Sequence, residues 1–332
     1  MLYYKLLLGV SVPVCLVLSL LIMVGNALVL RLLLRNGQRD AITMLMISLV
    51  VSDVAIGLVS FPMAMLFNAQ VVLPFQACVW LTCTSLCWII VSSLHHLAIA
   101  VDRWYRVSSP ARYLTSATRI RALMHIIACW TLAICFAYVP VFGYNNQELL
   151  RQAAANGSGV TWLTPRGQLH VICQNLVVLN LDYLVYVLFV VCTLLPVLAT
   201  TALYLLMLLR VGSGHQARVA ATAHVAEGLH ERKQRRLTAN MLLALLAYVL
   251  LKIPYNALNC VFLYCPTCQV PYWAVPFTFS LILCSAVFNP FIVFLTHKQA
   301  RDWCCRAAGC RRRWKRETVV SLVRVAERSV KT

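Results

Sequence analysis

Ionisable side chains occur inside or at the end of long apolar stretches of this 332-residue sequence. Asp53 and Lys252 lie well inside such stretches, and the adjacent residues Asp102 and Arg103 close another. An isolated charge is costly in hydrocarbon, so each of these side chains needs partners and marks a candidate functional site. They are therefore the first candidates for a binding or switching role.

Enzymatic chemistry has no comparable support in the sequence. His95 and His96 are adjacent, so on a helix they point in different directions and do not form an obvious metal pair. They are predicted to be packed helix residues. We find no nucleophile–base set, phosphate-binding loop or cofactor motif. The sequence therefore predicts neither an enzyme nor an organic cofactor.

The elements that must position these residues are predicted from composition. The chain is 61% hydrophobic and 12% charged, whereas soluble domains are about 45–50% apolar and about 25% charged. This argues against a soluble enzyme, a disordered chain or a small disulfide scaffold. Long apolar blocks suit helices that cross a bilayer, and the short alternating segments typical of a barrel are missing. We predict an all-α membrane protein with seven spans, at residues 9–34, 41–66, 77–102, 122–143, 176–210, 237–263 and 270–296.

The basic residues are unevenly distributed along the chain. Segments 31–40, 103–121, 210–236 and the tail from 297 carry 3, 5, 6 and 11 of the 29 Lys and Arg. The positive-inside rule then places the N-terminus outside the plasma membrane and the tail in the cytoplasm. The net charge of +19 is thus expected to attract anionic lipid and not nucleic acid. The sequon at Asn156 falls on a predicted outside loop, which makes Asn156 a candidate glycosylation site.

No internal repeat or low-complexity stretch divides the chain. We expect a short extracellular N-terminus (1–8), one seven-transmembrane domain (9–296), a short amphipathic eighth helix on the membrane surface (297–310) and a basic cytoplasmic tail (311–332). Cys304, Cys305 and Cys310 fall in the amphipathic and basic stretch. Cys304 and Cys305 are candidates for palmitoylation, with inert thiols as the alternative.

Almost every span carries a polar, aromatic or proline mark, and the set resembles the rhodopsin-like G-protein-coupled receptors from about residue 20 to 305. The marks are Asn26, Asp53, Asp102-Arg103-Trp104, Trp130, Pro196 with Tyr204, Pro254, and Asn289-Pro290. The resemblance implies that an outside ligand shifts helices and that a heterotrimeric G protein is engaged inside. A proline removes a helix hydrogen bond and permits a kink, so Pro254 and Pro290 are expected at the switch.

The resemblance also implies roles for the charged residues. In the family the Asp matching Asp53 joins polar groups around a sodium ion, here Asn26, Ser92, Ser285 and Asn289. An oxygen-lined pocket suits a hard cation, and the alternative is an Asp53 that is simply hydrogen-bonded or protonated. At the cytoplasmic end Arg103 would face the G protein, held at rest by Asp102.

Other cytoplasmic positions depart from the family pattern. Gln234 replaces the acidic residue that restrains the Arg, and Val293 replaces a Tyr that acts with the residue matching Tyr204. Gln234 weakens the restraint on the Arg and so favours activity, whereas Val293 removes a hydroxyl that the active state uses and so opposes it. Basal activity is therefore left open.

The details are most similar to the adenosine receptors, above all in Asn259-Cys260-Val-Phe-Leu-Tyr-Cys265-Pro-Thr-Cys268. In that family the Asn matching Asn259 makes two hydrogen bonds to adenine, since an amide offers a donor and an acceptor. The alternative is a helix-end residue facing water. The resemblance pairs Cys78 with Cys173 in a disulfide. Cys265 and Cys268 fit a loop disulfide or, by spacing, a metal or redox site; with no other ligands near, we favour the disulfide.

The predicted ligand pocket departs from the adenosine receptors at most contact positions. Asn175 stands where a Phe stacks on the purine, and the remaining changes are Ile89, Leu176, Leu188, Asn256, Ile282 and Leu283. Sugar hydroxyls facing aliphatic carbon would lose about 1–3 kcal/mol each, so we predict poor adenosine affinity in the usual pose. Ser85 stands where amine receptors need an Asp, which disfavours an amine ligand.

Lys252 replaces the sixth-span Trp of the family. Two interpretations are open. Its ammonium reaches towards Asp53 and substitutes for sodium, or it lines a wet ligand cavity and attracts an anionic ligand group.

The sequence therefore predicts a receptor for a small extracellular molecule, with a purine nucleoside as one candidate. The predicted ligand-binding residues are Asn259, Asn256, Lys252, Asn175, Ser85 and Ile282. A non-purine ligand and a constitutive or non-signalling receptor are the alternatives within the class. A channel or transporter is disfavoured because matched repeats and broken half-helices are missing.

Overall fold

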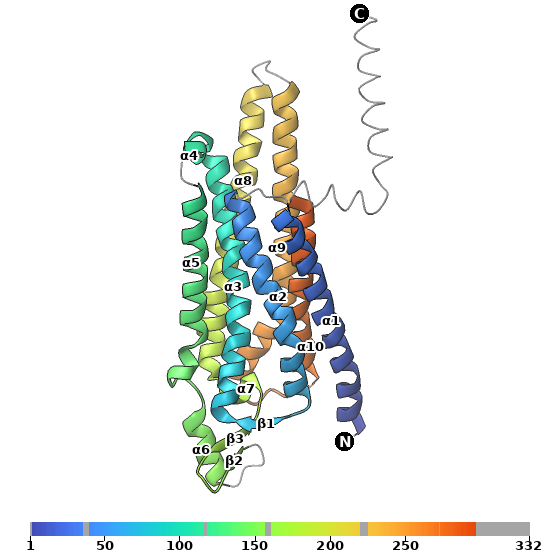
Figure 1. The fold of residues 1–332 in the computed structure, drawn as a ribbon, viewed down its shortest axis with the longest axis vertical. Coiled ribbons are helices and arrows are strands. Elements are labelled where there is room, and N and C mark those ends of the chain that lie inside the picture. Colours follow the sequence, from blue (N-terminus) through green and yellow to red (C-terminus); the bar gives the residue numbers. More distant parts are fainter. Residues whose placement is uncertain are drawn as a thin grey trace, which may run out of the picture.

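A computed structural model describes residues 2–35, 40–115, 118–156, 161–219, 225–271 and 273–296. Seven long helical segments run along the length of the molecule (Figure 1). Each overlaps one of the predicted apolar blocks, so the predicted seven-helix bundle is confirmed. The segments are α1 (Leu2–Arg35), α2 (Ala41–Asn68), α3 (Phe75–Ser108), α5 (Thr118–Ala137), η2 (Tyr183–Leu194) continued by α8 (Leu195–Val219), α9 (Val225–Tyr264) and α10 (Ala274–Thr296).

The surface of the bundle is apolar in the way a membrane requires. Six of the segments are long and apolar enough to cross a bilayer, and α10 adds an apolar stretch from Ala274 to Pro290. Large apolar side chains such as Leu28, Ile127 and Leu198 are exposed on its outside. Helices satisfy their own backbone groups, so such a surface is stable against lipid. The predicted eighth helix and the basic tail lie outside the described residues.

The helix ends differ from the predicted ones at several places. The first helix already begins at Leu2, so residues 2–8 are helical and continuous with the first span. The fifth span begins at Tyr183 and not near 176, because residues 175–178 form a separate short helix, α7 (Asn175–Val178). Between the two, the Asn180 side-chain oxygen accepts the backbone N–H of Asp182 at 2.8 Å, a local bond that competes with a continuous helix.

Small elements gather at the end of the bundle that also holds the N-terminus (Figure 1). Three short strands pair antiparallel in the order β1-β3-β2, with Leu73 opposite Val171 and Trp162 opposite His170. The short helix α4 lies at the opposite end of the bundle. The elements are β1 (Val72–Pro74), α4 (Pro110–Thr115), η1 (Val139–Phe142), α6 (Gln147–Ala155), β2 (Thr161–Leu163) and β3 (Leu169–Ile172).

Helix α3 is the central element of the fold. It is buried at intervals from Phe75 to Asp102 and packs against α2, α5 and α8. The marker residue Trp130 on α5 donates its indole N–H to Ser48 Oγ on α2 at 3.1 Å and packs edge-on against Trp88 of α3. A Trp with both an apolar body and one donor is well suited to joining three helices in this way.

The first part of the fifth span, from Tyr183 to Leu194, is a π-helix, and Pro196 follows two residues after its end. The Leu195 N–H bonds to the Val190 carbonyl, and Thr193 Oγ1 donates to the Leu188 carbonyl at 2.9 Å. The backbone bond from Leu195 spans five residues, which is the wider spacing of a π-turn, and such turns are frequent at functional sites. Pro196 itself has no N–H to contribute to the ladder. The widened turn carries Leu184 and Leu188, which line the cavity described below.

Helices α1 and α2 approach closely at Gly57. A Cβ added there would lie 2.7 Å from Met23 Cγ and 3.1 Å from the Met23 backbone N, whereas one added at Gly9 would meet nothing within 4 Å. Small residues are what permits such close approach between membrane helices.

We expect Gly57→Ala to destabilise the receptor by about 1–3 kcal/mol, because the methyl group forces the two backbones apart. Gly9→Ala is the matched control and should be neutral or slightly stabilising, since alanine is the better helix former. Thermal unfolding in detergent measures both. Equal melting temperatures for the two variants would contradict the close approach.

Candidate functional site

A buried polar cluster surrounds Asp53 in the middle of the bundle. Ser92 Oγ on α3 donates to Asp53 Oδ1 at 3.0 Å, and Asn289 Nδ2 on α10 donates to Asp53 Oδ2 at 2.7 Å. All three residues are buried. The structure thus brings together three of the residues predicted to surround a cation, and the carboxylate has the partners that its position requires.

The other two predicted members of this cluster face backbone carbonyls. Asn26 Nδ2 donates to the Ile22 carbonyl at 2.9 Å and lies 3.4 Å from the Ala286 carbonyl, and Ser285 Oγ donates to the Ile282 carbonyl at 2.6 Å. The Oδ1 atom of Asn26 is a buried acceptor with no donor among the described residues. The Oδ1 atom of Asn289, whose amide nitrogen donates to Asp53, has the His96 ring as its neighbour. Amide oxygens together with a carboxylate are ligands that suit a hard cation.

Lys252 lies on α9, buried, with 5% of its surface exposed. Its Nζ donates to Ser93 Oγ at 3.0 Å and to the Tyr248 hydroxyl, and it sits 4.2 Å from the centre of the Tyr248 ring. The two hydroxyls are 2.7 Å apart. The predicted reach towards Asp53 is therefore corrected: the two groups interact only through their longer-range field, because the ammonium is held by the turn of α3 next to Ser92.

Lys252 also lines a cavity between α3, the fifth span, α9 and α10. The cavity has a volume of about 50 Å³, below the roughly 300–1,000 Å³ of a typical ligand pocket. It is narrow and mainly apolar. Its lining residues are Leu86, Ile89, Ile90, Ser93, Asn175, Leu184, Leu188, Thr193, Lys252, Tyr255, Asn256, Asn259, Phe279 and Ile282.

Five of the six predicted ligand residues line this cavity: Asn175, Lys252, Asn256, Asn259 and Ile282. Asn256 donates to the Lys252 carbonyl at 2.9 Å, so its amide nitrogen is engaged within its own helix. Asn175 donates to the Tyr255 hydroxyl at 3.4 Å. The amide oxygens of Asn175 and Asn259 are buried and have no donor among the described residues.

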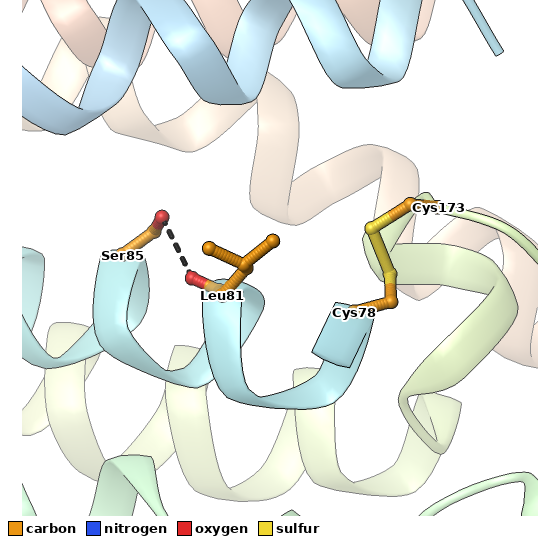
Figure 2. Close-up of a disulfide and its surroundings, with 4 residues drawn as sticks. All are labelled: Cys78, Leu81, Ser85 and Cys173. Atoms are coloured by element: carbon orange, nitrogen blue, oxygen red, sulfur yellow. Dashed lines mark hydrogen bonds between the residues drawn. A yellow bond between two sulfur atoms is a disulfide. The ribbon is translucent and has the colours of Figure 1, made fainter. Parts of the chain in front are cut away.

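Ser85, the sixth predicted ligand residue, lies outside this lining. Its hydroxyl donates to the Leu81 carbonyl at 3.1 Å, one turn back along α3 (Figure 2). The prediction placed Ser85 by sequence position alone, whereas the next residue, Leu86, lines the cavity, because neighbours on a helix point in different directions.

Sequence reasoning missed Tyr255 and Phe279, whose rings stack edge-on at 6.3 Å beside the two asparagines. A signal was present for Tyr255. It lies three residues after Lys252 and four before Asn259, so the three share one face of α9.

Two disulfides hold the end of the bundle nearest the cavity. Cys78 at the start of α3 joins Cys173 after β3 (Figure 2), and Cys265 joins Cys268 after α9. Both pairings agree with the predictions. The first disulfide attaches the segment after β3 to α3. Asn175, which lines the cavity, follows Cys173 by two residues.

The opposite end of the bundle holds the residues that were predicted to form the switch. Asp102 accepts from Arg121 of α5 and from the Tyr113 hydroxyl of α4, both at 3.1 Å. Burial first, and then the Asp102 carboxylate, raise the pKa of Tyr113, so its hydroxyl stays protonated and donates. The predicted Asp102–Arg103 pair is corrected by this contact. Neighbours on a helix point in different directions, and the carboxylate turns towards α5.

Arg103 is left without that restraint. Its Nε is buried with no hydrogen-bond partner in the part of the chain that the structure describes. Tyr204 on α8 is buried and lies within its electrostatic range, as predicted for the switch. Pro254 and Pro290 lie inside α9 and α10. Cys304, Cys305, Cys310 and the side chains of Gln234 and Val293 lie outside what the structure describes.

A seven-helix bundle with a cavity at one end and a charged cluster at the other defines a class of membrane receptors. The sequence pattern of the 7 transmembrane receptor (rhodopsin family) matches residues 25–292, and the chain belongs to that family. It is a receptor and not an enzyme.

Within this family the chain is similar to adenosine receptor A2a. The Homo sapiens protein is 27% identical over 288 residues, which cover 86% of this chain and 68% of that receptor. The Equus caballus protein is 28% identical over 288 residues, with 85% and 68% covered. The resemblance to the adenosine receptors stated from the motifs is thereby confirmed.

Proposed function

We propose that this protein is a plasma-membrane receptor that binds a small extracellular molecule in the Lys252 cavity and passes the signal to a heterotrimeric G protein. The N-terminus and the strands lie outside, and α4 with the inner ends of α8 and α9 lies in the cytoplasm. The observation that carries the proposal is a pair of buried polar clusters held by two neighbouring residues of α3. One joins Lys252 in the cavity to Ser93, and the other joins Ser92 to Asp53 and Asn289.

This arrangement supports a coupling mechanism. A ligand that contacts Lys252 acts two residues before Pro254, where α9 has lost a backbone hydrogen bond and can bend. Bending there displaces the far end of α9, next to Tyr204 and Met241. A G protein that binds only the displaced form would stabilise it, and a ligand with higher affinity for that form would do the same.

A sodium ion at Asp53 would fit this mechanism as a modulator. Asp53, Ser92, Asn26 and Asn289 would hold it, and it would supply the positive charge that the carboxylate lacks nearby. The protein residues themselves bridge α2, α3 and α10, so any movement of α10 must break or rearrange the 2.7 Å bond from Asn289.

Adenosine itself is expected to bind weakly. The cavity wall offers Ile89, Leu188 and Ile282 where sugar hydroxyls would need partners, and each unpaired hydroxyl costs about 1–3 kcal/mol. A purine in a different pose remains within the proposal through Asn259. Saturable binding of an adenosine analogue at nanomolar concentration would contradict the expected weak affinity.

The receptor function is tested by nucleotide exchange. Purified receptor in lipid nanodiscs should accelerate GDP release from at least one G-protein subtype, and Arg103→Ala should abolish that acceleration. Arg210→Ala is a control at the same end, since that side chain is exposed and bonds to the Ser108 carbonyl. No exchange with any subtype, or equal exchange by Arg103→Ala, would reject the proposal.

The orientation is tested at Asn156, which is exposed at the end of α6 beside the strands. We expect the receptor from a glycosylating cell to migrate faster after glycosidase treatment, and Asn156→Gln to migrate at that faster position without treatment. A glycosidase-insensitive protein with unchanged Asn156→Gln mobility would remove this support for the outside placement.

A further inference from the structure

Among the described residues, no carboxylate forms an ion pair with Lys252, and Asp53 acts on it only through the longer-range field. An ammonium offers three N–H donors, and two of them reach neutral oxygens, Ser93 Oγ and the Tyr248 hydroxyl. Hydroxyl groups solvate the charge but do not neutralise it. A charge that is buried to 5% exposure remains costly until an anion joins it.

The described part of the chain supplies no such anion at the cavity. None of the described lining residues is an Asp or Glu. Within the ranges that the structure describes, the ion pair found is Arg121 with Asp102, at the other end of the bundle. Asp53 accepts hydrogen bonds from Ser92 and Asn289 and does not contact the Lys252 ammonium directly. The missing partner of Lys252 is therefore a ligand group.

The rest of the lining indicates what carries that group. The walls between the polar ends are apolar, from Leu86, Ile89, Leu184, Leu188, Phe279 and Ile282. Beyond them lie the buried amide oxygens of Asn175 and Asn259, which lack donors in the described structure. A ligand that suits both ends has an anion, a short apolar body and a hydrogen-bond donor.

The number of charges selects the kind of anion. Lys252 is the single cationic side chain among the described lining residues, which include no Arg. A carboxylate, with one charge, is balanced by it. A phosphate, with nearly two, would leave charge uncompensated in an apolar cavity. The small volume, about 50 Å³, also restricts the ligand to a compact body.

We propose that the cavity binds a small organic monocarboxylate, whose carboxylate accepts the free N–H of the Lys252 ammonium and whose apolar body lies against Ile89, Leu188 and Phe279. This deepens the receptor function proposed above, on which it rests, by naming the class of ligand. The amide oxygen of Asn259, a residue that carries the family resemblance, would then accept a hydrogen bond from the donor group of the acid.

The test is the thermal stabilisation of the purified full-length receptor by carboxylic acids, compared with the uncharged carboxamide of each acid. The probes are benzoate, hexanoate and indole-3-acetate, each paired with its primary carboxamide. At least one acid should raise the melting temperature, with a half-maximal concentration at least about tenfold lower than that of its carboxamide.

Variants of Lys252 assign the effect to the cavity. Lys252→Gln should remove the preference for acid over carboxamide, and Lys252→Arg should keep it. If Lys252→Gln does not fold, Lys252→Trp, which carries the residue common in the family, takes its place. Acids that fail to stabilise the wild type, or that stabilise it no better than carboxamides or equally in the neutral variants, overturn the proposal.

This readout is independent of signalling. Stabilisation by an acid without nucleotide exchange would uphold the binding site and reject the receptor function. Nucleotide exchange without any acid-selective stabilisation would uphold the receptor and reject the acid.

Discussion

Receptor carrying Cys173→Ala should lose about 2–5 kcal/mol of unfolding free energy, the range found when a native disulfide is removed. Cys173 is completely buried and joins the end of β3 to the start of α3. Without the bond, the segment that carries Asn175 is held to α3 mainly by the β1–β3 pairing, which covers three residue pairs. Thermal unfolding in detergent should therefore begin at a clearly lower temperature.

The same variant should also affect the cavity. Asn175 follows Cys173 by two residues and contributes one of the two unpaired amide oxygens, so ligand affinity should fall together with stability. Cys135→Ala is the matched control, because Cys135 is a free, exposed cysteine on α5. Cys78→Ala and the double variant should behave like Cys173→Ala. A melting temperature equal to that of Cys135→Ala would contradict a bond between these residues.

Arg121→Ala is expected to have the second large effect, a loss of about 2–4 kcal/mol. Removing one partner of a buried ion pair costs about 3–5 kcal/mol because the other charge stays buried. The Asp102 side chain is fully buried, but that of Arg121 is 23% exposed, which reduces the value. Arg121 also lies 4.7 Å and 4.8 Å from the centres of the Tyr105 and Tyr113 rings, so the truncation removes those contacts too.

Basal signalling should change in the same variant. With Arg121 removed, the Asp102 carboxylate is available to the neighbouring Arg103, which would then acquire the restraint it lacks in this structure. We expect slower basal nucleotide exchange alongside the lower melting temperature. Arg119→Ala is the control, since Arg119 is exposed on the same first turn of α5. Unfolding and basal exchange indistinguishable from the control would contradict the assigned pairing.

The candidate site was predicted unevenly, and the reasons are physical. Asp53 with Ser92 and Asn289 was correctly grouped, because a mid-membrane carboxylate can be stable only among donors from other spans. Lys252 was correctly singled out because a buried charge is costly in a membrane, but its hydrogen-bond partners, Ser93 and Tyr248, were not predicted. Whether an ammonium on a long stem turns to Asp53 or to Ser93 depends on the rotation of α9 about its axis, which local sequence does not specify.

The sequence by itself determined the number and position of the spans and the family of the protein. Hydrophobicity is a property summed along the chain, and a bilayer selects apolar stretches of sufficient length whatever their neighbours are. It also favoured the loop disulfide at Cys265 and Cys268, since two cysteines three residues apart can reach one another in a turn, and the structure contains that bond. These features need no knowledge of how helices are arranged around one another.

Only the tertiary structure decided which side chains meet. Asp102 lies beside Arg103 in the chain yet pairs with Arg121, and Ser85 is not among the cavity-lining residues whereas Tyr255 and Phe279 are. Successive residues of a helix are rotated by about 100°, so one position along a span changes the neighbour completely. Contacts between spans are set by helix rotation and depth, and these are fixed only when all seven helices pack.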